Sequence, residues 1–319
     1  MPTMKAVQVP AEGQALELVE VPVPAPAELQ VLLRVEACGV CHGEAKIIEG
    51  WASSYPRIPG HEVVGIVEQL GAGVTKWQVG QRVGIGWHGG QDNTTGMTMD
   101  GGYAEYMVAF EDGLVAIPEG LSPEEAAPLL CAGETVFSAL RNSKARPGDL
   151  VAISGIGGLG HLAVQYAHKA GFETVAISRG ADKDKPAREL GAHHYIDAEQ
   201  EDVAEALKKL GGAKVIIATA PKASAIKPLI GGLGAGGELI LAAVTDEQLG
   251  WSALDFLGGS ATVKGTFTDV NALGDTLRFS NLTGVRPQIE VFPLAQAREA
   301  FDKMMAAQTK FRAVLSMAK

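Results

Sequence analysis

The chain has 319 residues, of which 46% are apolar and 20% charged, so it is long enough to bury one large or two medium hydrophobic cores. Its formal net charge is −10 and no cluster of Lys or Arg interrupts the acidic balance, which disfavours nucleic acid and anionic membranes as partners. The first ten residues lack the basic start and apolar stretch of a secretory signal, and no apolar run could span a bilayer. We therefore expect a cytoplasmic protein with no membrane or nucleic-acid partner.

Residues 1–120 have the pattern of an all-β domain. Short alternating or apolar runs are separated by Gly and Pro turns at the spacing of a barrel-like fold. The expected strands are 5–9, 16–21, 30–35, 63–69, 82–85 and 103–110. Three prolines in residues 21–26 predict an irregular connection, because proline cannot donate to a strand ladder. The polar, Gly-rich residues 88–100 show no periodicity and are expected to form a surface loop.

From Ser122 the pattern changes to helices and strands in alternation. Residues 122–143 begin with a Ser cap and an acidic first turn and continue with helical spacing. The expected elements that follow are strands at 150–154, 174–178, 194–196, 214–218, 238–244 and 262–267, with helices at 161–169, up to 190 and at 203–210. Such alternation predicts an α/β fold with a doubly wound parallel sheet of the Rossmann type. Two helical patterns at 271–281 and 294–307 and a strand at 311–316 are expected to return to the first domain.

A glycine-rich turn follows the expected strand at 150–154 and opens the expected helix at 161–169. Its residues, which fit the spacing GxGxxG, include Gly155, Gly157, Gly158, Leu159 and Gly160. Glycines here permit a tight turn and close backbone approach, so that a pyrophosphate can sit at the positive helix N-terminus. The strand–turn–helix context favours dinucleotide binding over glycines that only make a turn.

The residues after the second strand of this domain bear on the choice of cofactor. An acidic residue there would hold the ribose 2′-hydroxyl of NAD(H). The chain instead has Ser178 and Arg179, with Lys183 soon after. Because a hydroxyl and two cations suit a 2′-phosphate, we expect NADP(H) to be preferred, with NAD(H) as the alternative.

The three cysteines do not form a disulfide framework. An odd count in a chain this long fits a reducing compartment. Cys41, Cys131 and His61 could supply two thiolates and an imidazole to a catalytic zinc ion, with Glu62 as an occasional fourth ligand. Spacing alone does not distinguish these ligands from ordinary core residues. Cys38 makes a CxxC with Cys41, which leaves a redox or zinc role open, but a lone cysteine of this kind is more often a small buried apolar residue.

Several segments resemble the zinc-dependent medium-chain alcohol dehydrogenases, along essentially the whole chain. They are GVCH at 39–42, GHEVVGIVEQLGAGV at 60–74, DGGYAEY at 100–106, AAPLLCAG at 126–133 and GIGGLGHLAVQYA at 155–167. The resemblance implies that Cys41, His61 and Cys131 bind catalytic zinc with Glu62 nearby. It also implies a GroES-like, mostly β catalytic domain at residues 1–130 and 269–319 and a Rossmann dinucleotide-binding domain at residues 131–268.

The same resemblance assigns roles around the cofactor and the substrate. It implies that Thr135 approaches the nicotinamide and that His42 and Arg312 face the pyrophosphate. Trp51 and Trp87 fall where the family's substrate pocket is walled, although simple packing would explain them equally well. The implied reaction is hydride transfer between the nicotinamide and an alcohol/aldehyde or ketone pair, with zinc polarising the oxygen.

The chain departs from the family pattern between positions 87 and 101. The family commonly has a lobe there in which four cysteines hold a structural zinc, whereas this chain has thirteen residues without a cysteine. We therefore expect one catalytic and no structural zinc. The loop is expected to be mobile or to rest on a neighbouring subunit.

A second departure lies beside the first zinc ligand. The family usually has Ser or Thr there, which relays the substrate's proton, followed by Asp, which orients the zinc-bound histidine; this chain has Gly43 and Glu44. Glycine cannot relay a proton, so a water in the space left at Gly43 would have to carry it, or activity would be reduced. Glu44 could orient His61 from one methylene further away.

Two other functions remain open. A zinc-free quinone or enone reductase of the same fold would not need the three ligands, so bound zinc separates the two. Gly43 and the missing lobe also leave room for a degenerate, non-enzymatic cofactor-binding protein. The expected sheet edge at 262–267 resembles the edge by which the family pairs its cofactor domains, so we expect a homodimer, with a homotetramer as the alternative.

Overall fold

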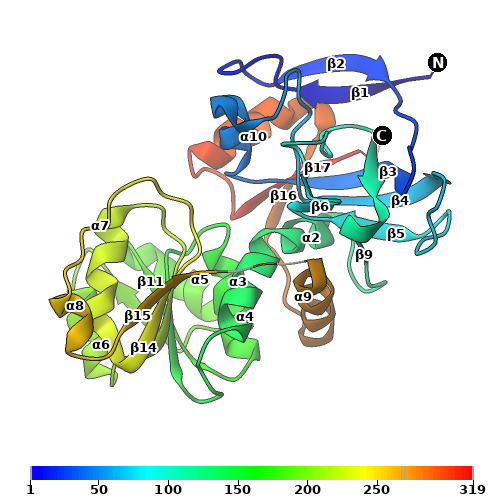
Figure 1. The fold of residues 1–319 in the computed structure, drawn as a ribbon. Coiled ribbons are helices and arrows are strands. Elements are labelled where there is room, and N and C mark those ends of the chain that lie inside the picture. Colours follow the sequence, from blue (N-terminus) through cyan, green and yellow to red (C-terminus); the bar gives the residue numbers. More distant parts are fainter. Residues whose placement is uncertain (1, 267, 269, 318–319) are drawn as a thin grey trace. The chain divides into compact units, whose positions relative to one another are not determined.

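The structure is a computed structural model that describes residues 2–266, 268 and 270–317. The chain forms two compact units, Met1–Cys131 with Asp269–Lys319 and Ala132–Thr268 (Figure 1). The expected boundary differs from this division by one residue, because Cys131 lies with the first unit. Within the described ranges, no helix is both long and apolar enough to cross a membrane.

The first unit contains a seven-stranded sheet, and its predicted mostly β, GroES-like fold is confirmed. The order is β16-β17-β3-β4-β5-β9, and β8 also pairs with β3. Only β16 and β17 are parallel to each other among the pairs of this sheet that the structure describes. The strands are β3 (Gln30–Val40), β4 (Val63–Leu70), β5 (Arg82–Ile85), β8 (Tyr106–Phe110), β9 (Leu114–Ala116), β16 (Ile289–Pro293) and β17 (Arg312–Ser316). A separate hairpin pairs β1 (Thr3–Gln8) with β2 (Glu17–Pro22).

The register of β3 brings distant parts of the sequence to one end of this sheet. In β3, the apolar side chains of Val31, Leu33 and Val35 are buried in the core, and alternation along the strand fixes the face they occupy. The end of β3 lies beside the start of β4 and beside the start of β17, because Cys38 pairs with Val63 and Val40 pairs with Ala313. Residues that follow β3, precede β4 or begin β17 therefore lie close together.

One helical segment of this unit was not expected from the sequence. Directly after β3, Glu44–Lys46 form α1 and Ile47–Trp51 form a π-helical turn. Gly43 precedes α1 with helical backbone angles, and Gly50 has φ 105 within the π-helical turn. The segment is too short to show a helical period, which is why the all-β interpretation missed it.

The loop at residues 88–100 is more regular than expected. β6 (His88–Gly90) and β7 (Asn93–Thr94) form an antiparallel pair around Gln91 and Asp92, which both have positive φ. Two central residues with positive φ match the twist of a tight hairpin. At the end of the loop, Asp100 Oδ1 accepts a hydrogen bond from Nη1 of the buried Arg57 at 2.9 Å. This charged pair attaches the loop to the unit.

The Ser cap predicted a helical region correctly. The Ser122 hydroxyl accepts a hydrogen bond from the Glu125 amide, and the Glu125 carboxylate accepts one from the Ser122 amide, both at 3.1 Å. This capping box starts the helix. The region consists of α2 (Pro123–Ala126), a 3-10 turn (Ala127–Leu130) and α3 (Ala132–Arg141). Cys131 lies at the break before α3, where the backbone leaves the helical conformation.

The second unit is a six-stranded parallel sheet in the order β12-β11-β10-β13-β14-β15, and the predicted Rossmann fold is confirmed. Its strands are β10 (Leu150–Ser154), β11 (Glu173–Ser178), β12 (His194–Asp197), β13 (Ala213–Ala218), β14 (Leu233–Leu241) and β15 (Thr262–Gly265). The helices besides α3 are α4 (Gly160–Lys169), α5 (Asp184–Glu189), α6 (Val203–Lys209), α7 (Ala223–Ile226) and α8 (Leu254–Leu257). Figure 1 shows α6 and α7 on one side of this sheet and α3 and α4 on the other. The strand order reverses between β10 and β13, where open α/β sheets bind ligands.

The C-terminal residues return to the first unit, as expected. They form α9 (Val270–Thr283), a 3-10 turn (Leu294–Gln296) and α10 (Ala297–Met305), besides β16 and β17. β17 pairs antiparallel with β3, which is how the last residues join the first sheet. The expected end of β15 at Phe267 lies outside the described residues.

Candidate active site

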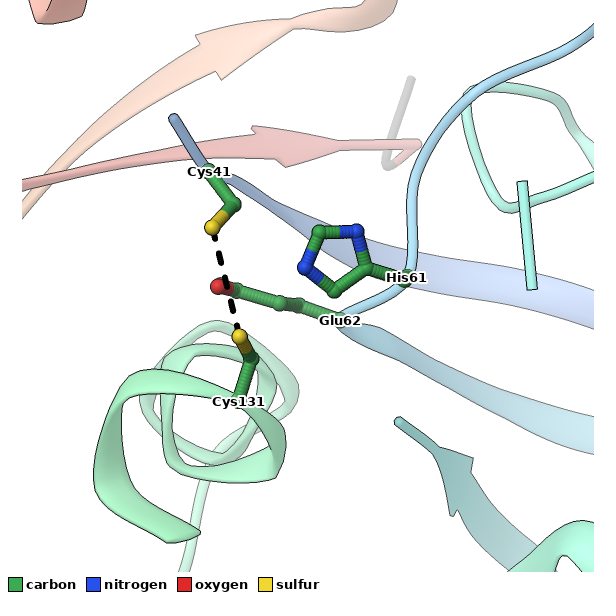
Figure 2. A group of neighbouring side chains, drawn as sticks. All are labelled: Cys41, His61, Glu62 and Cys131. Carbon is green, nitrogen blue, oxygen red and sulfur yellow. Dashed lines mark hydrogen bonds between the residues drawn. The ribbon is translucent and has the colours of Figure 1, made fainter. Parts of the chain in front are cut away.

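Four side chains of the first unit gather into one group (Figure 2). The ligand atoms of Cys41, His61, Glu62 and Cys131 all lie within 4.8 Å of one another. Cys41 follows β3, His61 and Glu62 precede β4, and Cys131 lies at the break before α3. Among the residues that the structure describes, no other group of three or more His, Cys, Asp and Glu comes as close together.

The two thiols of this group are spaced as a tetrahedral metal ion requires. Cys41 Sγ and Cys131 Sγ are 3.9 Å apart. Two thiolates bound at about 2.3 Å to a tetrahedral zinc ion would be about 3.8 Å apart. The hydrogen bond with Cys131 lowers the pKa of Cys41 well below its ordinary value, and the same bond raises the pKa of Cys131. A divalent cation binds thiolates, so it would displace any proton held between the two sulfurs.

His61 lies against Glu44, the residue predicted to orient it. His61 Nδ1 lies 2.8 Å from Glu44 Oε1, and the Gly60 amide donates to Glu44 Oε2 at 3.2 Å. Because Nδ1 is engaged, Nε2 is the nitrogen left for a metal. Burial lowers the pKa of His61, but the charges of Glu44 and Cys41 outweigh burial and raise the pKa well above its ordinary value.

Glu62 is held by Arg312. Arg312 Nη2 donates to Glu62 Oε2 at 2.6 Å, and both side chains are buried. Burial raises the pKa of Glu62 to about 7, although the charge of Arg312 opposes this shift. The resemblance implies that Arg312 faces a pyrophosphate; the structure places its guanidinium against Glu62, and the pyrophosphate contact stays a prediction. With Glu62 paired, the remaining three ligands would leave one position of a tetrahedral metal open, as in catalytic zinc sites.

The backbone around this group of side chains is closely packed. A Cβ added to Gly39 would lie 1.8 Å from Glu62 Oε2. A Cβ added to Gly60, whose φ is 104, would lie 2.5 Å from the ring of Tyr103. No side chain fits at either position, so these two glycines are required for Glu62 and His61 to stand where they do.

The aromatic and basic residues expected near the substrate and the cofactor lie in different surroundings. Trp87 stands edge-on against His61, with ring centroids 5.0 Å apart and planes at 87°. Trp51 is 58% exposed, and the ammonium of Lys46 lies 5.5 Å from its ring centroid. His42 is exposed. Trp87 therefore contacts a predicted ligand, while the roles of Trp51 and His42 stay predictions.

In the second unit, the glycines of the predicted dinucleotide turn have three different environments. Gly155 has φ 95, which favours glycine. A Cβ on Gly160 would lie 1.8 Å from the Gly155 carbonyl oxygen, so α4 packs tightly on the turn. A Cβ on Gly157 would have no neighbour within 4 Å, so this backbone is open to a ligand. These environments fit a pyrophosphate-binding turn, of which Gly158 and Leu159 form the rest.

The residues expected near the cofactor's ribose and nicotinamide also belong to this unit. Ser178 ends β11, and Arg179 and Lys183 follow it with exposed side chains. Thr135 lies in the first turn of α3, and its carbonyl accepts a hydrogen bond from the Thr266 hydroxyl at 3.1 Å. All four predicted residues keep their expected roles as predictions.

The loop after β11 is fastened by two residues that the sequence analysis missed. The Tyr195 hydroxyl donates to the Gly180 carbonyl at 2.6 Å, and the Gly180 amide donates to Asp197 Oδ1 at 2.9 Å. Both partners come from β12, where Asp197 pairs with Ser178 in the parallel register. No sequence motif indicates this contact, because it depends on which strand lies beside β11.

Comparison with known proteins identifies the family. Residues 27–119 match the family described as alcohol dehydrogenase GroES-like domain, and residues 158–279 match the family described as zinc-binding dehydrogenase. The alcohol dehydrogenase patD of Penicillium expansum is 43% identical over 330 residues, which cover 96% of this chain and 95% of the relative. The chain belongs to the medium-chain, zinc-type alcohol dehydrogenase family. A member of this family is an oxidoreductase.

Solved structures of other proteins are similar to this alcohol dehydrogenase family member over its whole length. A cinnamyl alcohol dehydrogenase from Sorghum bicolor has a TM-score of 0.87 at 28% identity, covering 99% of this chain and 98% of its own. A zinc-binding dehydrogenase from Sinorhizobium meliloti bound to NADP has a TM-score of 0.88 at 25% identity, and the match covers 99% of this chain and 100% of that one. The dehydrogenase fold predicted from the sequence is therefore confirmed.

Proposed function

We propose that this protein is a zinc-dependent dehydrogenase that transfers a hydride between NADP(H) and an alcohol/aldehyde or ketone pair. The observation that carries the proposal is the group of Cys41, His61 and Cys131, whose two sulfurs are 3.9 Å apart beside an imidazole whose Nδ1 lies 2.8 Å from Glu44 Oε1. The match to a zinc-binding dehydrogenase family and the relative named alcohol dehydrogenase support it.

The chain's own residues would hold the reacting groups. Cys41 and Cys131 would bind zinc as thiolates, and His61 would bind through Nε2 while its Nδ1 faces Glu44 Oε1 at 2.8 Å. Bound zinc would supply Lewis acidity at the substrate oxygen, and the nicotinamide would accept or return the hydride. Gly43 has no hydroxyl, so the alcohol's proton would leave through water, one proton for each hydride transferred.

The preference for NADP(H) rests on the loop after β11. The loop offers Ser178, Arg179 and Lys183 and no carboxylate at the end of β11. The nearby Asp197 is already engaged, because its Oδ1 accepts hydrogen bonds from the amides of Gly180 at 2.9 Å and Glu199 at 3.0 Å. The NADP bound to the Sinorhizobium meliloti dehydrogenase is consistent with this preference.

Arg179→Asp is expected to raise the KM for NADPH by about tenfold or more, because a charge-assisted hydrogen bond to phosphate contributes about 1.5–3 kcal/mol. The KM for NADH should change much less, since NADH lacks the 2′-phosphate. Lys185→Asp is the matched control, because Lys185 is a highly exposed cation on the neighbouring α5. Steady-state kinetics with both cofactors measure the effect. Equal changes for NADPH and NADH in Arg179→Asp would remove Arg179 from this role.

Two other functions give different results in the same assays. A zinc-free quinone or enone reductase would turn over without bound metal. A degenerate, non-enzymatic protein would bind cofactor but oxidise or reduce none of a panel of alcohols, aldehydes and ketones. The thiol spacing favours the zinc enzyme over both, because neither alternative needs two thiols and an imidazole in one group.

A further inference from the structure

The backbone at Gly43 does not require glycine. Gly43 has φ −56 and ψ −25, which are ordinary helical angles that any residue adopts. A Cβ added there would have its nearest neighbour at 3.2 Å, at His61 Cε1, so the imidazole would have to move by a few tenths of an ångström. Gly39 and Gly60 differ, because an added Cβ there would clash severely. Packing therefore explains those two glycines but not Gly43.

The bare Cα of Gly43 faces two ligand atoms. An added Cβ would lie 3.7 Å from Cys41 Sγ and 3.8 Å from His61 Nε2, the nitrogen left for the metal. The Gly43 amide also donates to Cys41 Sγ at 3.4 Å, which fixes the backbone beside that sulfur. A side chain at this position would therefore project beside the ligands, where the substrate oxygen must also bind.

Two large groups of the first unit border the predicted ligands. The indole of Trp87 stands edge-on against His61, and the Glu62–Arg312 pair fills the buried side of the group. Gly43 itself is half-buried, so solvent reaches it in part. The missing side chain at residue 43 thus leaves space beside Cys41 Sγ and His61 Nε2 that any larger residue there would occupy.

We propose that Gly43 makes this protein prefer secondary alcohols and ketones over primary alcohols and aldehydes. The carbon that bears the oxygen carries two carbon substituents in a secondary alcohol and only one in a primary alcohol. The second substituent needs room of about one methyl group, and the absent side chain of Gly43 supplies it. The inference rests on the proposed function and names the substrate class of the same site.

Gly43→Ala tests the proposal, because it adds a methyl group without a hydroxyl. If the methyl group also displaces a proton-carrying water, turnover of both alcohols falls alike and the ratio between them does not change. The ratio of kcat/KM for 2-butanol to that for 1-butanol should exceed one in the natural protein. It should fall by about tenfold or more in Gly43→Ala, since one methyl group in a hydrophobic pocket discriminates about 10–200-fold. Gly259→Ala is the matched control, because an added Cβ at this exposed glycine has no neighbour within 4 Å.

A binding measurement compares the affinities for the two alcohols without turnover. With reduced cofactor present, neither alcohol can be oxidised, so tryptophan fluorescence reports the relative affinity for 2-butanol and 1-butanol. Gly43→Ala should weaken the binding of 2-butanol more than that of 1-butanol by a similar factor. Zinc content and melting temperature of both variants show whether the site remains intact.

The proposal is overturned if the natural protein prefers 1-butanol, a result that does not depend on any variant. It is also overturned if Gly43→Ala leaves both ratios unchanged, which includes an equal fall in kcat/KM or in affinity for the two alcohols. Absence of turnover with every alcohol and ketone would contradict the proposed function instead, and the binding ratio would then still decide the inference about Gly43.

Discussion

Cys41→Ser is expected to remove the metal and abolish turnover while NADPH binding persists. The variant loses one of two thiolates that are 3.9 Å apart, and a serine hydroxyl is a poor zinc ligand at neutral pH. If zinc supplies about 4 kcal/mol of charge stabilisation in the transition state, turnover falls about a thousandfold. Metal analysis, steady-state kinetics and a fluorescence titration with NADPH measure the three quantities. The dinucleotide turn lies in the second unit, so cofactor binding should be spared.

Cys38→Ala is the matched control for this variant. Cys38 is fully buried three residues from Cys41, but it lies outside the ligand group. Burial raises the pKa of its thiol well above the ordinary value, so it is a poor competitor for the metal. Cys38→Ala should lose some packing stability and keep its zinc and its turnover. Full turnover by metal-free Cys41→Ser would show that the reaction does not need this site.

Glu44→Gln is expected to weaken zinc binding by about 10–100-fold, because the partner that orients a metal-bound histidine contributes about that much. Glu44 holds both His61 Nδ1 at 2.8 Å and the Gly60 amide at 3.2 Å. The glutamine keeps the size of the side chain and loses its charge. Competition with a chelator of known affinity measures the zinc dissociation constant. An unchanged constant would mean that Glu44 only fills space.

The pH dependence of zinc binding separates charge from shape at Glu44. Glu44 raises the pKa of His61 in the metal-free protein, so protons compete with zinc and affinity rises with pH until His61 is neutral. In Glu44→Gln the raised pKa of His61 falls, so the rise in affinity should end at a lower pH than in the unsubstituted protein. Glu44→Asp keeps the negative charge, so the zinc affinity should go on rising to the same high pH as in the unsubstituted protein. Identical pH profiles for all three proteins would contradict an electrostatic role.

Local sequence patterns predicted the fold wherever an apolar run was long or a cap or glycine-rich turn marked the end of an element. The apolar run of β10 before the glycine-rich turn and the Ser122 capping box placed the Rossmann sheet and the start of the helical region correctly. The short segment Glu44–Trp51 and the hairpin around Gln91 and Asp92 were missed. Each is only a few residues long and shows no helical or strand period.

The ligand group was predicted from residue types and family resemblance, but its details depend on strand register. Cys41, His61 and Arg312 meet because β3 lies between β4 and β17, and spacing along the chain cannot show this. The pairing of Arg312 with Glu62 and the contact of Tyr195 with Gly180 arise in the same way. The sequence shows a glycine at position 43. Only the atoms around it show that packing does not force the residue to be glycine.

Zinc content measured together with a substrate panel tests the central claim most directly. The purified protein should contain one zinc ion per chain, and it should oxidise alcohols or reduce their carbonyl partners with NADP(H). Removal of the zinc with a chelator should abolish both reactions, and added zinc should restore them. A protein that binds no zinc at the Cys41, His61 and Cys131 group and still reduces quinones or enones would contradict the account.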